Sequence, residues 1–151
     1  MTRTNARELA MLLAAALASG EEEAAEVIDR FFEREHFKTL SGEGGQFAEY
    51  PDKTQMAYIR TLAALTVEKR AEIDGYIETY ARGWTVNRLS RAAAAILRCA
   101  MCEILYLPDI PDAAAINEAV ELAKKYEDED GPAFINGVLG GFVRGEKGAG
   151  E

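Results

Sequence analysis

Apolar residues recur along the chain at the three- and four-residue spacings of amphipathic helices. Sustained apolar–polar alternation, the pattern of a half-buried strand, occurs nowhere in the sequence. The periodic segments predict about seven helices, at 5–18, from 19 onward, at 53–65, 66–83, 90–107 and 112–126, and around 135–142. The sequence therefore predicts an all-α protein.

The predicted helix boundaries rest on capping and breaking residues. Asn5 can cap the first helix with Glu8 as its capping-box partner, and Ser19 with Glu22 repeats that signature. Thr66 is the predicted cap of the fourth helix. Residues 37–51 are polar and rich in glycine, which indicates a flexible connection between two halves of the chain.

Residues 134–139 read FINGVL, and Asn-Gly between apolar residues is a strong signal for a β-hairpin. The apolar positions 135, 138, 139 and 142 instead follow the spacing of one helix face, so we expect a helix here. Gly137 then costs about 1 kcal/mol relative to alanine. We therefore predict a close approach of another helix at Gly137, and internal partners for Asn117 and Asn136 beside the apolar stripes.

The composition is that of an ordinary globular protein, with 151 residues, 48% hydrophobic and 28% charged. This length suits one well-cored domain or two small bundles that share an interface. No apolar run reaches the roughly 18–20 residues of a membrane span. The apolar segment 9–17 follows Arg3 and Arg7 like a signal peptide, but it lacks a clear A-x-A site and three glutamates follow. We expect a cytoplasmic protein.

The formal net charge of −9 opposes tight binding of nucleic acid by electrostatic attraction alone. The charge is uneven, however, because residues 81–102 contain no acid. That stretch carries Arg82, Arg88, Arg91 and Arg98. This asymmetry allows one basic face on an acidic molecule, although solvated helix surfaces would give the same pattern.

Residues that could support catalysis or metal binding are few. Cys99 and Cys102 form a C-x-x-C inside an apolar helical run, with no second cysteine pair or nearby histidine to complete a zinc site. We interpret both as core residues. His36 is the only histidine and has no nucleophile beside it in the sequence. These features predict no enzyme, no metal and no other cofactor.

Several motifs in the C-terminal half occur in the order and with the separations of one family. They are Trp84, Arg88-Leu89, residues 95–98 (AILR), 103–105 (EIL), 109–111 (DIP), 116–124 (INEAVELAK) and 134–139 (FINGVL). In this respect the chain resembles the NusB family of bacterial transcription antitermination factors. The N-terminal half matches more weakly, through Ala6-Arg7-Glu8 and its helical spacing.

The resemblance implies a single NusB-like domain over residues 1–151, made of two three-helix bundles at about 3–65 and about 66–144. It implies a non-enzymatic protein that binds the boxA element of ribosomal RNA leader transcripts together with the ribosomal protein NusE. That complex joins elongating RNA polymerase and suppresses termination. Family members include monomers and dimers, so the resemblance also allows a homodimer.

The resemblance assigns site residues position by position. Arg3 and Arg7 match the basic N-terminal arm and would contact RNA phosphates, and Asp130 and Phe134 match the loop and helix that approach the RNA. Arg98 and Glu103 lie on a helix of the bundle that meets NusE. From the residues alone, each of these side chains would be structural.

Two departures from the family pattern concern RNA affinity. The usual run of basic residues before Ala-Arg-Glu is reduced to Arg3 and Arg7, and the usual Gln-Ala-Leu-Tyr is replaced by residues 12–15, LLAA. The alternative function is therefore a helical protein-interaction adaptor that has lost most RNA affinity. A NusB-like domain fused to a methyltransferase is disfavoured, since the sequence shows no cofactor-binding domain.

Overall fold

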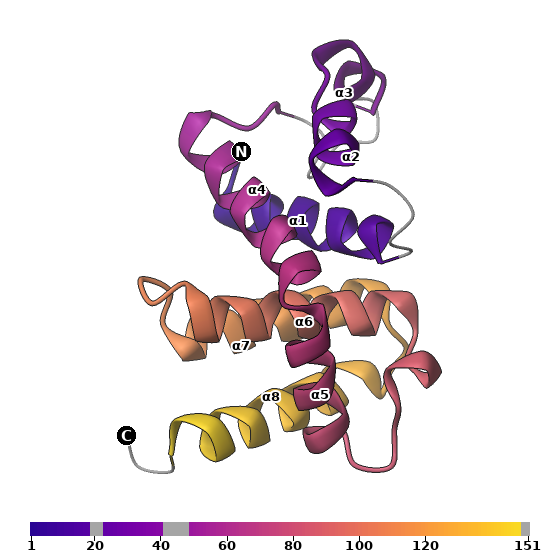
Figure 1. Ribbon diagram of the computed structural model, residues 1–151, viewed down its shortest axis with the longest axis vertical. Coiled ribbons are helices and arrows are strands. Elements are labelled where there is room, and N and C mark those ends of the chain that lie inside the picture. Colours follow the sequence, from indigo (N-terminus) through magenta and orange to yellow (C-terminus); the bar gives the residue numbers. More distant parts are fainter. Residues whose placement is uncertain (19–22, 41–48, 149–151) are drawn as a thin grey trace.

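The computed structural model describes residues 1–18, 23–40 and 49–148, and within these ranges it contains eight α-helices, one 3₁₀ turn and no strand (Figure 1). The prediction of an all-α protein is confirmed. The elements are α1 (Arg3–Leu17), α2 (Ala24–Phe31), α3 (Arg34–Leu40), α4 (Lys53–Glu68), α5 (Arg70–Tyr80), η3 (Val86–Arg88), α6 (Arg91–Tyr106), α7 (Asp112–Tyr126) and α8 (Gly131–Lys147).

The helices form two groups that meet along α1 and α6. Figure 1 shows α1 to α4 in the upper half and α5 to α8 in the lower half, with α4 leading into α5. Helix α1 packs against α4 on one side and α6 on the other, while α7 lies between α6 and α8. One continuous hydrophobic cluster joins the two groups. The proposed bundle boundary near residue 65 stays a prediction.

Side-chain caps fix where three of these helices begin. Thr2 caps α1 by accepting from the N–H of Asn5 at 3.0 Å, so the predicted cap at Asn5 is wrong by three residues. Asp52 and Gln55 form a reciprocal capping box at the start of α4. Ser90 caps α6 through the N–H of Ala93.

Two other boundaries differ from the prediction. Helix α4 continues through Thr66, whose buried hydroxyl donates to the carbonyl of Ala63 instead of capping a new helix. Residues 37–40 belong to the short helix α3 and not to a connection, because the ring of Phe37 packs against Phe32 and Tyr50. The predicted cap at Ser19 and the glycines at 42–45 lie outside the described residues.

The FINGVL segment is helical, as predicted, and lies inside α8. The predicted close approach at Gly137 is wrong, since Gly137 is exposed and a Cβ there would meet nothing within 4 Å. The close approaches on this helix lie at Gly131, against Glu127, and at Gly145, against Tyr80. Asn117 and Asn136 are also exposed, so their amides can bond to water and do not need the internal partners that the sequence predicts.

The core confirms the assignment of the cysteines. Cys99 and Cys102 are both free thiols buried on α6, within the hydrophobic cluster that joins the two groups of helices. Burial raises the pKa of Cys102 to about 12 and raises that of Cys99 well above its ordinary value. Both are therefore inert packing residues at neutral pH.

Candidate nucleic-acid interface

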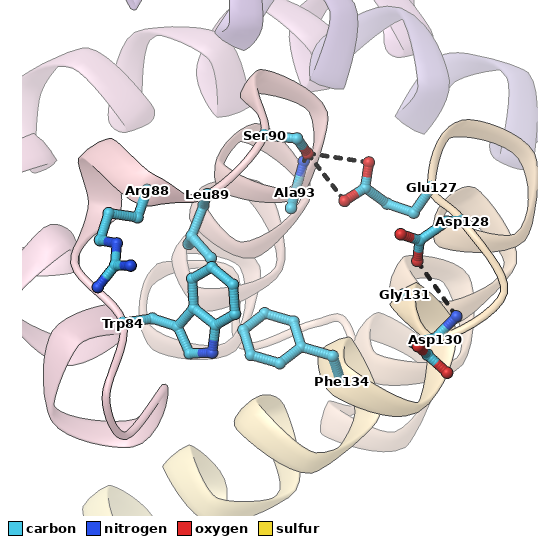
Figure 2. Close-up of a pocket in the computed structure, with 10 residues that line it drawn as sticks. All are labelled: Trp84, Arg88, Leu89, Ser90, Ala93, Glu127, Asp128, Asp130, Gly131 and Phe134. Carbon is cyan, nitrogen blue, oxygen red and sulfur yellow. Dashed lines mark hydrogen bonds between the residues drawn. The ribbon is translucent and has the colours of Figure 1, made fainter.

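A pocket of about 410 Å³ opens where the segment before α6 meets the junction of α7 and α8 (Figure 2). Its walls come from the 84–90 segment, the first turn of α6, the end of α7 and the start of α8. The lining residues are Trp84, Arg88, Leu89, Ser90, Ala93, Glu127, Asp128, Asp130, Gly131 and Phe134. Two of the four predicted RNA contacts, Asp130 and Phe134, thus lie in one pocket.

One side of the pocket is aromatic. The rings of Trp84 and Phe134 meet edge to face, with centroids 6.0 Å apart and planes at 64°. The Arg88 guanidinium carbon lies 5.9 Å from the Trp84 ring. Trp84 is 45% exposed and is the only large hydrophobic side chain classed as exposed in the described part of the chain. An exposed indole beside a phenyl ring is suited to stacking with a planar ligand.

The other side of the pocket is acidic. Figure 2 shows Glu127, Asp128 and Asp130 across the pocket from Arg88. The Ser90 hydroxyl donates to both carboxylate oxygens of Glu127, at 2.8 and 2.9 Å, and so ties the start of α6 to the end of α7. The Asp128 carboxylate accepts from the N–H of Asp130 at 3.2 Å. These bonds hold the acidic wall in place.

Asp130 differs from its neighbours. It occupies the cap position of α8, yet its side chain makes no capping hydrogen bond. Among the described residues no hydrogen-bond donor is paired with its exposed carboxylate, although its backbone N–H bonds to Asp128. This carboxylate is therefore an acceptor directed to solvent and open to a ligand.

The two N-terminal arginines occupy different environments, and neither lines the pocket. Arg3 is exposed, with its guanidinium carbon 5.3 Å from the centre of the Tyr58 ring. Arg7 is buried, and its guanidinium contacts Glu103 at 3.2 Å and Glu118 at 3.4 Å. Only Arg3 therefore presents its charge at the surface.

Glu103 is the centre of a buried polar cluster between α1, α4 and α6. Its carboxylate accepts from Arg7 and from the Tyr58 hydroxyl, the latter at 3.2 Å. Burial raises the pKa of Glu103, and the nearby Arg7 opposes that rise. Burial, with the charge of Glu103 as a second cause, also raises the pKa of Tyr58. The neighbouring Glu8 ties α1 to α7 by accepting from Lys125 at 2.6 Å and from the Tyr126 hydroxyl.

Arg98 is also held inside the protein. Its guanidinium donates to both carboxylate oxygens of Asp74, at 2.8 and 3.0 Å, and this bidentate pair joins α6 to α5. The side chain of Arg98 is 10% exposed and that of Glu103 is 4% exposed. The predicted role of these two residues in partner binding stays a prediction, and their burial favours an indirect one.

The sequence analysis names Trp84 only as part of the family pattern. It names Arg88 as part of that pattern and of the acid-free stretch 81–102, and assigns neither residue to the RNA site. The signal for Trp84 was its place directly after Gly83, outside every apolar helical stripe. Its contact with Phe134, 50 positions later, depends on how α8 packs beside the 84–90 segment and could not be read from either motif. Gly83 has φ +83°, which only glycine adopts readily, and this turn directs the chain to Trp84.

The described residues contain neither a candidate metal site nor a candidate membrane span. No group of three or more His, Cys, Asp or Glu side chains among residues 1–18, 23–40 and 49–148 is arranged to hold a metal ion. None of the helices described is both long enough and apolar enough to cross a membrane.

Comparison with known proteins identifies the family. The sequence pattern of the NusB family matches residues 4–144, nearly the whole chain. The chain belongs to the NusB family. The transcription antitermination protein NusB of Clostridium tetani is 39% identical over 147 residues, which cover 92% of this chain and 95% of that protein. NusB of Clostridium novyi is 35% identical over 95% of this chain and 99% of its own length.

Some relatives match more strongly over a shorter region. NusB of Thermoanaerobacter pseudethanolicus is 50% identical over 92 residues, and the match spans 65% of that protein's length. The curated relatives are named as transcription antitermination proteins, and this membership confirms the prediction that the protein is not an enzyme.

Solved structures show the same NusB fold. The NusB of T. maritima aligns with a TM-score of 0.78 and 25% identity, covering 95% of this chain and 92% of that one. A crystal structure of the antitermination factors NusB and NusE in complex with double-stranded RNA gives a TM-score of 0.73 and 26% identity. That alignment covers 95% of this chain and 96% of the other.

Proposed function

We propose that this NusB family protein is a transcription antitermination factor that binds boxA RNA of ribosomal RNA leader transcripts together with NusE. In this role it joins the antitermination complex on RNA polymerase. The observation that carries the proposal is the near-complete alignment, 95% of this chain, with a NusB solved in complex with NusE and RNA. The alignment also covers 96% of that chain, so it extends through both halves of this one.

The RNA contacts that we propose are Arg3, Asp130 and Phe134. Arg3 supports this role because its charge is exposed at the start of α1, where a phosphate can reach it. Phe134 supports it because its ring lies beside the exposed Trp84 in an open pocket. Asp130 lies at the edge of the same pocket with a carboxylate that does not cap its own helix.

Arg7, Arg98 and Glu103 would act on the partners by positioning α6. Arg7 and Glu103 join α1 to α6, and Arg98 joins α6 to α5 through Asp74. All three side chains are buried, so their effect on NusE or RNA is transmitted through the placement of these helices. We further propose that the protein works in the cytoplasm, where the transcripts are made, and that any homodimer is secondary to the NusE pair.

A gel-shift titration tests the proposed function. Labelled single-stranded boxA RNA is mixed with the protein alone, with NusE alone and with both together. With a net charge of −9, the protein alone should bind weakly, whereas the pair should bind at least about tenfold more tightly because NusE adds basic charge. A scrambled RNA of the same length is the control. Equal affinity for boxA and scrambled RNA, with NusE present, would contradict the proposal.

One observation favours the adaptor as a second candidate. With Arg7 held by Glu103 and Glu118, Arg3 is the only exposed arginine at the start of α1. If the protein and NusE co-elute in gel filtration but the pair shifts no RNA, the adaptor function replaces the RNA-binding one.

A further inference from the structure

The pocket in Figure 2 has a chemistry of its own, set by an exposed indole on one side and three carboxylates on the other. We infer that it holds one unpaired RNA base that carries an amino group, stacked on Trp84 and read by Asp130. This inference rests on the proposed RNA-binding function. It adds Trp84 as a base-contacting residue and gives the pocket a preference for adenine, cytosine or guanine over uracil.

The shape and charge of the pocket favour a base over a phosphate. Glu127, Asp128 and Asp130 contribute three carboxylates, against one guanidinium from Arg88 at the opposite edge. A phosphate inside the pocket would be repelled by this acidic wall. A base is neutral and flat, and its π face can stack on the exposed part of Trp84.

The aromatic side is already arranged for stacking. Phe134 meets Trp84 edge to face, which supports the indole without covering its face completely, as the 45% exposure of Trp84 shows. Arg88 lies 5.9 Å from the same ring, at the edge opposite the acids. A base that stacks on Trp84 would thus have its sugar-phosphate directed to Arg88 and its hydrogen-bonding edge directed to the carboxylates.

The acidic side sets the preference among bases. A carboxylate accepts hydrogen bonds and donates none, so it pairs with the exocyclic amino groups of adenine, cytosine and guanine. Uracil presents two carbonyl oxygens on either side of a single N–H, and these oxygens repel a carboxylate. The oxygens of Glu127 are bonded to Ser90, and Asp128 is bonded to the N–H of Asp130. Asp130 is the acceptor that remains open to the base.

Trp84 is the chain's single tryptophan, so its fluorescence reports directly on this pocket. The protein is titrated at low ionic strength with short single-stranded homopolymers of A, C or U. We expect A and C to quench the emission at concentrations about tenfold lower than U requires. Asp130→Asn supplies a side chain that both donates and accepts, and should reduce that preference to less than about threefold. No quenching by any RNA, or equal responses to all three, would overturn the inference.

A second measurement separates this inference from the proposed function. In the gel shift with NusE and boxA RNA, Trp84→Ala should weaken binding about tenfold or more, whereas Trp84→Phe, which keeps a stacking ring, should recover most of it. In the fluorescence titration Trp84→Phe is the blank, because it leaves the chain without tryptophan. If the complex forms with boxA but Trp84→Ala binds as well as the parent, the base pocket is wrong and the RNA-binding function stands. If no complex forms, the proposed function itself fails.

Discussion

The Arg7 guanidinium lies 3.2 Å from a carboxylate oxygen of Glu103, and the two side chains are only 8% and 4% exposed. This buried ion pair joins the first helix of the chain to the central helix of the second group. From the family resemblance, the same arginine was expected to belong to a basic N-terminal arm that contacts RNA phosphates. Its position in the fold makes it a connection between the two halves.

Removing one member of this pair should be costly. Arg7→Met leaves Glu103 buried without its main partner, and we expect a loss of about 3–5 kcal/mol in unfolding free energy. The double variant Arg7→Met/Glu103→Leu removes both charges and should recover most of that loss. Urea denaturation measures both. A double variant as unstable as the single one would show that the pair itself supplies net stability.

Arg3 provides the matched surface test. Arg3→Ala removes an exposed charge, so the unfolding free energy measured in urea should stay within about 0.5 kcal/mol of the parent value. The affinity of the complex with NusE for boxA RNA should fall, and the logarithmic salt slope should decrease by about 0.7 for one lost phosphate contact. Lys124→Ala, another exposed cation, is the control. An unchanged salt slope would mean that Arg3 contacts no phosphate.

Two glycines of α8 should respond oppositely to alanine. A Cβ on Gly137 meets open space, so Gly137→Ala should stabilise the protein by about 0.5–1 kcal/mol through helix propensity. A Cβ on Gly131 would overlap the Cβ of Glu127, and Gly131→Ala should destabilise by about 1–3 kcal/mol. Thermal melts followed by circular dichroism compare them. If both variants shift the melting temperature in the same direction, the packing at the start of α8 is not as described.

Because its thiol is buried, Cys102 should make the unfolding free energy decrease at alkaline pH. The pKa of Cys102 is raised from 9.0 to about 12, so between these values the folded state keeps a proton that the unfolded state loses. Stability is therefore fully present below about pH 9 and declines as pH rises towards about 12, by up to about 1.4 kcal/mol per pH unit for this group.

Cys102→Ala tests that decline. The variant should lose about 1 kcal/mol less than the parent between about pH 9 and about pH 10, as measured by urea denaturation at each pH. Cys99 and the tyrosines with raised pKa values are present in both proteins, so both still lose some stability as the pH rises. Identical slopes would show that Cys102 ionises as easily in the folded state as in the unfolded one.

Much of the fold could be predicted from local patterns, because long amphipathic segments such as α6 and α7 carry their period in their own residues. Short elements were harder. Helix α3 has seven residues and is stabilised by Phe37 packing against Phe32 and Tyr50, a tertiary contact that the sequence does not display. Thr66 has the side chain of a cap, but its hydroxyl bonds back to Ala63 within a continuous helix.

The site was predictable only in part. Asp130 and Phe134 could be named from the family pattern, while Trp84 gained a role only when folding placed it beside Phe134. For Gly137 the sequence predicted a contact that the structure does not contain. A glycine inside a helix suggested a close approach of another helix, but Gly137 lies on the exposed side of α8. Arg7, Arg98 and Glu103 have the charges of contact residues, but their partners inside the protein lie far away in sequence.

The central claim is that this chain acts in antitermination, and complementation of transcription tests it most directly. A bacterial extract depleted of its own NusB transcribes a template with boxA upstream of a terminator, with this protein or with the NusB of Clostridium tetani added as the positive control. We predict that this protein restores read-through on the boxA template and not on one with a scrambled element. If the clostridial protein restores read-through and this one does not, the proposed function is contradicted.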